Sequence, residues 1–116
     1  MNTKKIKPLL PSLKEKKRYL LFKVHSKELL GDFKSINNEI HHSCLSFMGQ
    51  KGTAQAGLWV LPDKYDQDTQ TGILRTGNKY VHDVKTSLSL IKKINSEDVV
   101  FQTLLVSGTL KKLSFR

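Results

Sequence analysis

The chain has little cysteine and no long apolar run, and both shortages exclude whole classes of protein. A single cysteine, Cys44, can form neither an internal disulfide nor a multi-cysteine zinc site. No run of about 18 apolar residues is present, so we expect no membrane-spanning helix. The basic N-terminus is not followed by the apolar stretch of a signal peptide. We therefore expect a cytoplasmic protein in a reducing compartment, with no membrane partner.

The sequence is equally poor in groupings that support bond cleavage. It shows no paired carboxylates, no nucleophile beside a base and no Walker-type phosphate loop. Asp63, Asp66 and Asp68 lack the glycine and terminal glutamate of a calcium loop, so a solvated acidic turn is expected. His41 and His42 are adjacent on a predicted helix and point about 100° apart. The sequence therefore predicts no catalytic residue, no metal site and no cofactor held by the protein itself.

Positive charge is abundant, and it gathers at the two ends of the chain. The formal net charge is +10. Residues 1–18 carry seven cations against one acid, Glu15, and the last six residues carry three cations and no acid. The two ends thus hold +9 of the total. Such segregation favours a polyanionic partner, nucleic acid first, over a soluble basic tail that binds nothing specific.

Apolar periodicity alternates between the period of strands and that of helices. The pattern predicts strands over 18–24, 56–61, 73–76 and 99–107, helices over 26–49 and 80–94, and a hairpin loop over 63–72. Ser26 is the expected cap of the first helix and Gly49 its expected stop. Cys44 falls in the apolar stripe of that helix, so it is expected to be a buried small hydrophobe.

This order of elements defines an expected fold. It is an α+β, ferredoxin-like or RNA-recognition-motif-like split β-α-β sandwich (βαββαβ), with two helices on one face of a four-stranded antiparallel sheet. Residues 1–17, with Pro8 and Pro11, are predicted to be a basic arm. Residues 18–110 form the single domain, and residues 111–116 form a basic tail.

The sheet face without helices is expected to be apolar. In the last strand, Val99, Phe101 and Leu105 should point one way and Val100, Leu104 and Val106 the other. Exposed apolar area indicates a protein interface, unless the arm or the tail folds back over it. The predicted partner interface consists of Tyr19, Leu21, Trp59, Leu61 and Leu105.

The sequence also indicates how RNA would be held. The third strand has no aromatic residue, and Tyr19 on the first strand is the only obvious central aromatic residue on the less apolar face, so the sheet is expected to be a poor stacking platform. Contacts to phosphates and recognition of RNA shape should dominate. The turn Ser107-Gly108-Thr109 follows a strand and precedes Lys111-Lys112, so it is either a phosphate cradle or an ordinary glycine turn.

Four segments resemble one known family. They are Leu10–Tyr19, Ala56–Val60, Gly72–Ile91 and Val106–Lys112, and they occur in the family's order over about Leu10 to Leu113. The family is archaeal ribonuclease P protein component 2, a small RNA-recognition-like subunit of ribonuclease P and MRP. The compact length resembles that of the archaeal members.

The resemblance implies a subunit of the endoribonuclease holoenzyme that removes the 5′ leader from precursor tRNA. The RNA would carry the chemistry and hold the magnesium. The implied partners are ribonuclease P RNA, the TIM-barrel subunit component 3, other ribonuclease P proteins and, indirectly, precursor tRNA. By analogy, RNA contact is expected at Lys14, Lys16, Lys17, Arg18, Lys85, Ser107, Gly108, Thr109, Lys111 and Lys112.

Two other functions remain open from the residues alone. One is a general RNA-binding or ribosome-associated module of the same fold. The other is a small metal-dependent nuclease that uses the three loop aspartates, although their spacing lacks a complete ligand set.

Overall fold

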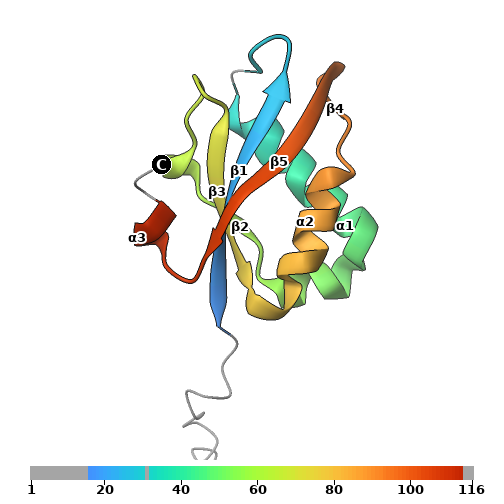
Figure 1. The fold of residues 1–116 in the computed structure, drawn as a ribbon. Coiled ribbons are helices and arrows are strands. Elements are labelled where there is room, and N and C mark those ends of the chain that lie inside the picture. The colour runs from blue at the N-terminus through green and yellow to red at the C-terminus, as the bar shows by residue number, and fades with distance from the viewer. Residues whose placement is uncertain (1–15, 31, 114–116) are drawn as a thin grey trace, which may run out of the picture.

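Five antiparallel strands form one sheet in the order β2-β3-β1-β5-β4, and helices α1 and α2 pack on one of its faces (Figure 1). The computed structural model describes residues 16–30 and 32–113. The elements are β1 Lys17–Ser26, α1 Phe33–Ala56, β2 Trp59–Val60, the 3₁₀ helix η3 Pro62–Lys64, β3 Thr71–Gly77, the 3₁₀ helix η4 Asn78–Tyr80, α2 Val81–Ser89, β4 Lys93–Ile94, β5 Glu97–Ser107 and α3 Leu110–Leu113. The predicted α+β class is confirmed. The predicted count of four strands is wrong, because β4 is inserted before the last strand.

The core lies between the sheet and the two main helices. Alternate residues of β1, namely Leu20, Phe22 and Val24, are buried against α1 and α2. The rings of Phe22 and Phe101 lie 5.8 Å apart and fill the centre of this layer. Cys44 is fully buried in the same core, as predicted, and burial raises the pKa of its thiol while a hydrogen bond with Ser87 partly opposes that rise.

Helix α1 starts later than predicted. Asp32 caps it, since its carboxylate accepts a hydrogen bond from the backbone N–H of Lys34 at 2.9 Å. The predicted cap, Ser26, is instead the last residue of β1, and its hydroxyl donates to the carbonyl of Glu28. Leu29 lies four residues before Phe33 and so fits the apolar spacing of the helix, but it is 67% exposed. The predicted start is therefore wrong by about two turns.

The predicted end of α1 at Gly49 is half correct. Gly49 has φ of 79° and interrupts the helix, but helical turns resume beyond it as far as Ala56. Gly57, with φ of 62°, then ends the helix in the left-handed conformation that glycine adopts without strain.

Helix α2 is shorter than its apolar spacing indicated. It ends at Ser89, and Lys93–Ile94 forms β4, which pairs with the start of β5. Asn95 and Ser96, with φ of 52° and 70°, make the tight turn between those two strands. Ile91 and Ile94 are both buried, so they satisfied a helical pattern without belonging to a helix.

A β-bulge in β5 changes which side chains face outward. Leu21 pairs with Leu105 but Phe22 pairs with Thr103, so Leu104 is the extra residue. Before the bulge, Val99 and Phe101 join the helix-covered core, whereas Leu105 lies with Leu21 on the opposite face. The prediction that Leu105 shares a face with Val99 and Phe101 is therefore wrong.

The short helix α3 covers part of the face that lacks α1 and α2 (Figure 1). Leu113 is 1% exposed and packs with Leu21 and Ile73. The C-terminal segment thus folds back over the sheet as far as Leu113. We call this second face the open face, because α3 leaves much of it uncovered. The division into arm, domain and tail remains a prediction, since most of residues 1–17 lie outside the described range.

Within the described residues, no helix is long and apolar enough to cross a membrane.

Candidate nucleic-acid interface

Most of the cations predicted to contact RNA are exposed. Lys16 and Lys17 stand at the start of β1, Lys85 lies on α2, and Lys111 and Lys112 lie on α3. Lys14 lies outside the described residues. The backbone carbonyl of Lys16 accepts a hydrogen bond from the N–H of Asn78 at 2.7 Å. This bond ties the start of β1 to the segment that leads into α2.

The structure brings Arg18 beside the predicted phosphate cradle. A β-carbon placed on Gly108 would stand 3.6 Å from Nη1 of Arg18, so the guanidinium lies against this turn. Arg18 Nη1 also donates to the carbonyl of Lys17 at 3.0 Å. Within the turn, the Thr109 N–H donates to the Ser107 hydroxyl oxygen at 3.1 Å. One amide of the cradle is therefore engaged, and the guanidinium is the strongest anion-binding group beside it.

Other predicted cations are not gathered at one point. Lys85 is on α2, which packs on the helix-covered face, whereas Lys111 and Lys112 are on α3 at the open face (Figure 1). The cations therefore lie on both sides of the sheet. Such an arrangement suits contacts with more than one stretch of phosphate backbone.

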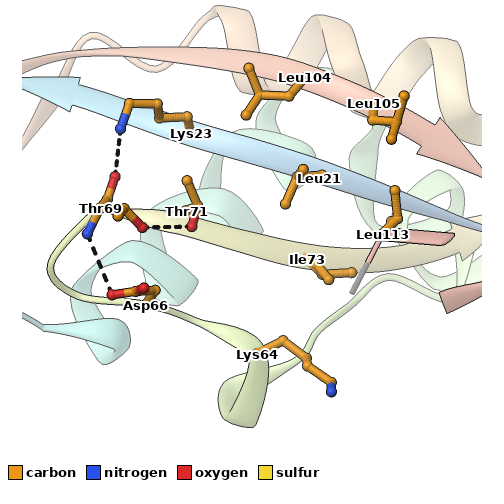
Figure 2. Close-up of a pocket in the computed structure, with 10 residues that line it drawn as sticks. All are labelled: Leu21, Lys23, Lys64, Asp66, Thr69, Thr71, Ile73, Leu104, Leu105 and Leu113. Carbon is orange, nitrogen blue, oxygen red and sulfur yellow. Dashed lines mark hydrogen bonds between the residues drawn. The ribbon is translucent and has the colours of Figure 1, made fainter. Parts of the chain in front are cut away.

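The open face carries an apolar groove of about 720 Å³ (Figure 2). Its apolar lining residues are Leu21, Ile73, Leu104, Leu105 and Leu113. Both leucines of the bulge contribute, because the extra residue turns two consecutive side chains toward this face. Of the predicted partner residues, Leu21 and Leu105 line the groove.

The rim of the groove is polar and held by hydrogen bonds. Lys23 Nζ donates to the carbonyl of Thr69 at 2.7 Å, and the hydroxyls of Thr69 and Thr71 are 2.8 Å apart (Figure 2). The Asp66 carboxylate accepts hydrogen bonds from the backbone N–H groups of Asp68 and Thr69. Asp66 therefore orders the turn that was predicted to be a solvated acidic loop.

The remaining predicted partner residues, Tyr19, Trp59 and Leu61, line a second, smaller hollow on the open face. Sequence reasoning missed Arg75, whose guanidinium carbon lies 5.6 Å from the centroid of the Trp59 ring. The missed groove residues are Ile73, Leu104 and Leu113. Period-two alternation in β3 could have placed Ile73 and Arg75 on the open face, because both alternate with the buried Leu74 and Thr76.

The described residues contain no cluster of three or more histidine, cysteine, aspartate or glutamate side chains that could hold a metal ion. His42 is exposed and His41 is half-buried, and burial lowers the pKa of His41. Within the described part of the chain, neither imidazole makes a hydrogen bond or ion pair with a carboxylate, so no acid–base pair forms there.

The fold and this surface together define a small α+β protein with a cationic sheet end and an open apolar face. The sequence matches the Rpp14/Pop5 family over residues 18–115. It is 42% identical to ribonuclease P protein component 2 of Pyrococcus furiosus over 107 residues, which cover 92% of this chain and 87% of that protein. It is 34% identical to the protein of the same name from Methanobrevibacter smithii over 112 residues, covering 92% of each chain.

A solved structure adds a match in fold. One chain of yeast ribonuclease MRP, determined by cryo-electron microscopy, superposes with a TM-score of 0.62 at 12% identity, over 84% of this chain and 77% of that chain. The chain described here therefore belongs to the Rpp14/Pop5 family. The resemblance to ribonuclease P protein component 2 that the sequence predicted is confirmed.

Proposed function

We propose that this chain is a non-catalytic protein subunit of ribonuclease P, the ribonucleoprotein that removes the 5′ leader from precursor tRNA. The observation that carries the proposal is the match, over nearly the whole length, to ribonuclease P protein component 2 of several archaea. The catalytic chemistry belongs to the RNA in this proposal, and so do the magnesium ions. The protein contributes positive charge and a docking surface.

The proposed RNA contact uses the exposed cations around the start of β1 and on α3. Arg18 beside Gly108 offers a fork of donors for one phosphate, and Lys111 and Lys112 follow directly after the same turn. Each neutralised phosphate releases condensed counterions, which favours binding at low salt. By lowering repulsion between packed RNA segments, these side chains would substitute for part of the magnesium requirement.

The proposed protein partner is component 3, the TIM-barrel subunit, and the apolar groove is its docking site. The groove exposes leucine side chains from β5 beside a buried floor, and hydrogen bonds fix its polar rim. An apolar centre with a polar margin is the usual anatomy of a protein interface. The groove is also continuous with the surface of α3, which carries Lys111 and Lys112, so one face would join the partner to the RNA.

Reconstitution tests the proposed function. The catalytic RNA and component 3 are assayed for leader removal, with and without this chain, across a magnesium titration. We expect the chain to lower the magnesium concentration at which half-maximal cleavage occurs. An unchanged magnesium requirement would contradict the proposal. Purification from cells with a broad mixture of RNAs would instead favour a general RNA-binding module.

A further inference from the structure

Three planar side chains lie side by side across the open face. Tyr19 of β1 pairs with Arg75 of β3, and Arg75 pairs with Trp59 of β2. Because paired residues of neighbouring strands point to the same face, the phenol, the guanidinium and the indole form one row. Adjacent strands are about 4.8 Å apart, so the row spans about 10 Å.

A contact within the protein holds this row in place, and the row is still exposed to solvent. The Arg75 guanidinium carbon sits 5.6 Å from the Trp59 ring centroid, which places the cation over the indole. Arg75 Nε is buried and has no hydrogen-bond partner. Trp59 nevertheless remains 54% exposed. The cation–π contact therefore holds the guanidinium beside an indole that stays open to solvent, and both groups offer a planar surface for stacking.

These side chains line a hollow of about 330 Å³ together with Leu61, Pro62, Asp63 and Leu110. This volume is at the lower end of the roughly 300–1,000 Å³ typical of small-ligand pockets, so it suits one nucleotide. The carboxylate of Asp63 in the wall disfavours a phosphate inside the hollow. It can instead accept hydrogen bonds from the amino or imino groups of a base.

A cation stands one step further along the strands on the same face. Lys17 pairs with Gly77, two residues before Tyr19 and two after Arg75, and same-face residues of a strand are about 7 Å apart. A β-carbon on Gly57 would lie 3.1 Å from Lys17 Nζ, so the lysine side chain reaches across Gly77 toward the start of β2. Its ammonium can meet the phosphate of a nucleotide whose base lies in the hollow.

We propose that this hollow, which we call the Trp59 pocket, binds one unpaired nucleobase of RNA. The base stacks on the row of Tyr19, Arg75 and Trp59, and its phosphate contacts Lys17. The inference rests on the proposed RNA contact and deepens it, because it adds a stacking site to a surface otherwise expected to read only phosphates. The sequence indicated a poor stacking platform since β3 has no aromatic residue, but an arginine guanidinium also stacks on bases.

Fluorescence gives a direct test, because Trp59 is the only tryptophan of the chain. The full chain is titrated with a short single-stranded oligoadenylate and, separately, with a fully paired RNA duplex containing the same number of phosphates. We expect the single strand to quench the indole emission at saturation and the duplex to leave it nearly unchanged. Binding of the single strand by anisotropy, with no change in tryptophan emission, would overturn the proposal.

Substitutions separate stacking from charge. Trp59→Ala should lower single-strand affinity by about 5- to 150-fold without changing the slope of log K against log salt, and Trp59→Phe should retain most of the affinity. Lys17→Gln should lower the magnitude of that slope by about 0.7. Because Trp59 is half exposed, circular dichroism and thermal melting should show an intact fold in both tryptophan variants.

The outcomes distinguish this proposal from the proposed function. If Trp59→Ala leaves RNA affinity unchanged while loss of Lys111 and Lys112 weakens it, the base pocket is rejected and the RNA-binding subunit stands. If Trp59→Ala weakens binding to component 3 and leaves RNA affinity unchanged, the pocket is a protein-docking site and the proposal is also rejected. If none of these variants affects RNA affinity, the proposed function fails as well.

Discussion

The guanidinium of Arg18 lies beside the backbone of Gly108, so the start of β1 meets the turn that follows β5. A β-carbon on Gly108 would stand 3.6 Å from Arg18 Nη1 and 3.9 Å from Cζ. These are ordinary van der Waals distances, so a methyl group fits at this position. It would nevertheless cover the flank of the guanidinium that the glycine leaves accessible.

Gly108→Ala should therefore separate binding from stability. We expect the free energy of unfolding to change by no more than about 0.5 kcal/mol, because the site is exposed and has room for the methyl group. RNA affinity should fall several-fold, since the methyl group hinders the approach of a phosphate to Arg18. Urea denaturation and RNA-binding anisotropy measure the two quantities. An intact fold with unchanged affinity would make this an ordinary glycine turn.

The proposed electrostatic contact has a characteristic salt dependence. Replacing Lys111 and Lys112 with glutamine should lower the magnitude of the slope of log K against log salt by about 1.4–1.8, because each lost phosphate contact contributes about 0.7–0.9. The matched control is the double variant of Lys27 and Lys34, two exposed lysines beyond the other end of β1. If the control variant lowers the slope equally, the positive charge acts through its total amount, and the location of Lys111 and Lys112 does not matter.

Much of the fold follows from local patterns in the sequence. The alternation of Leu20, Phe22 and Val24 predicted β1, and the spacing of Ile36, Ile40 and Cys44 predicted the buried face of α1; all six are buried. These patterns succeed because one side of each element packs against a single core. Burial then repeats with the period of the backbone.

The predictions from sequence fail where pairing between residues distant in the chain decides the structure. Ile94 is buried with helical spacing after α2, yet its backbone pairs with Glu97 in a hairpin. The bulge at Leu104 is set by how β5 registers on β1, and no local pattern encodes that extra residue. Arg75 was missed for the same reason, because its role depends on a cross-strand neighbour, Trp59, which is distant in sequence.

Gly72 is required by the aromatic residue opposite it. Phe22 pairs with Gly72, and a β-carbon on Gly72 would lie 2.7 Å from Phe22 Cζ and 3.1 Å from Tyr65 Cδ1. We expect Gly72→Ala to lower the free energy of unfolding by about 1–3 kcal/mol, because two packed rings must shift. Urea denaturation measures the change, and Gly108→Ala is the matched glycine control. Equal stability of the two variants would contradict the packing argument.

The single thiol should report on the integrity of the core. Cys44 is fully buried, and burial raises the pKa of its thiol, so less of the reactive thiolate is present at any pH below that value. We expect alkylation of the native protein at pH 8 to be at least about tenfold slower than that of the urea-unfolded protein. Mass spectrometry of timed iodoacetamide reactions measures both rates. Similar rates in the two states would mean that α1 does not stay packed on the sheet.

The groove on the open face can be tested with little risk to the fold. Leu104 is 42% exposed and lines the groove, so Leu104→Asp should leave the thermal unfolding midpoint nearly unchanged. It should weaken binding to component 3 by at least about tenfold, because a carboxylate would be buried without a partner in an apolar contact. Calorimetric titration of component 3 into each variant measures the affinity.

Val100→Asp is the control on the same strand, since Val100 is 63% exposed and is not among the residues that line the groove. If the Val100 variant binds component 3 as weakly as the Leu104 variant, the partner does not dock specifically in the groove.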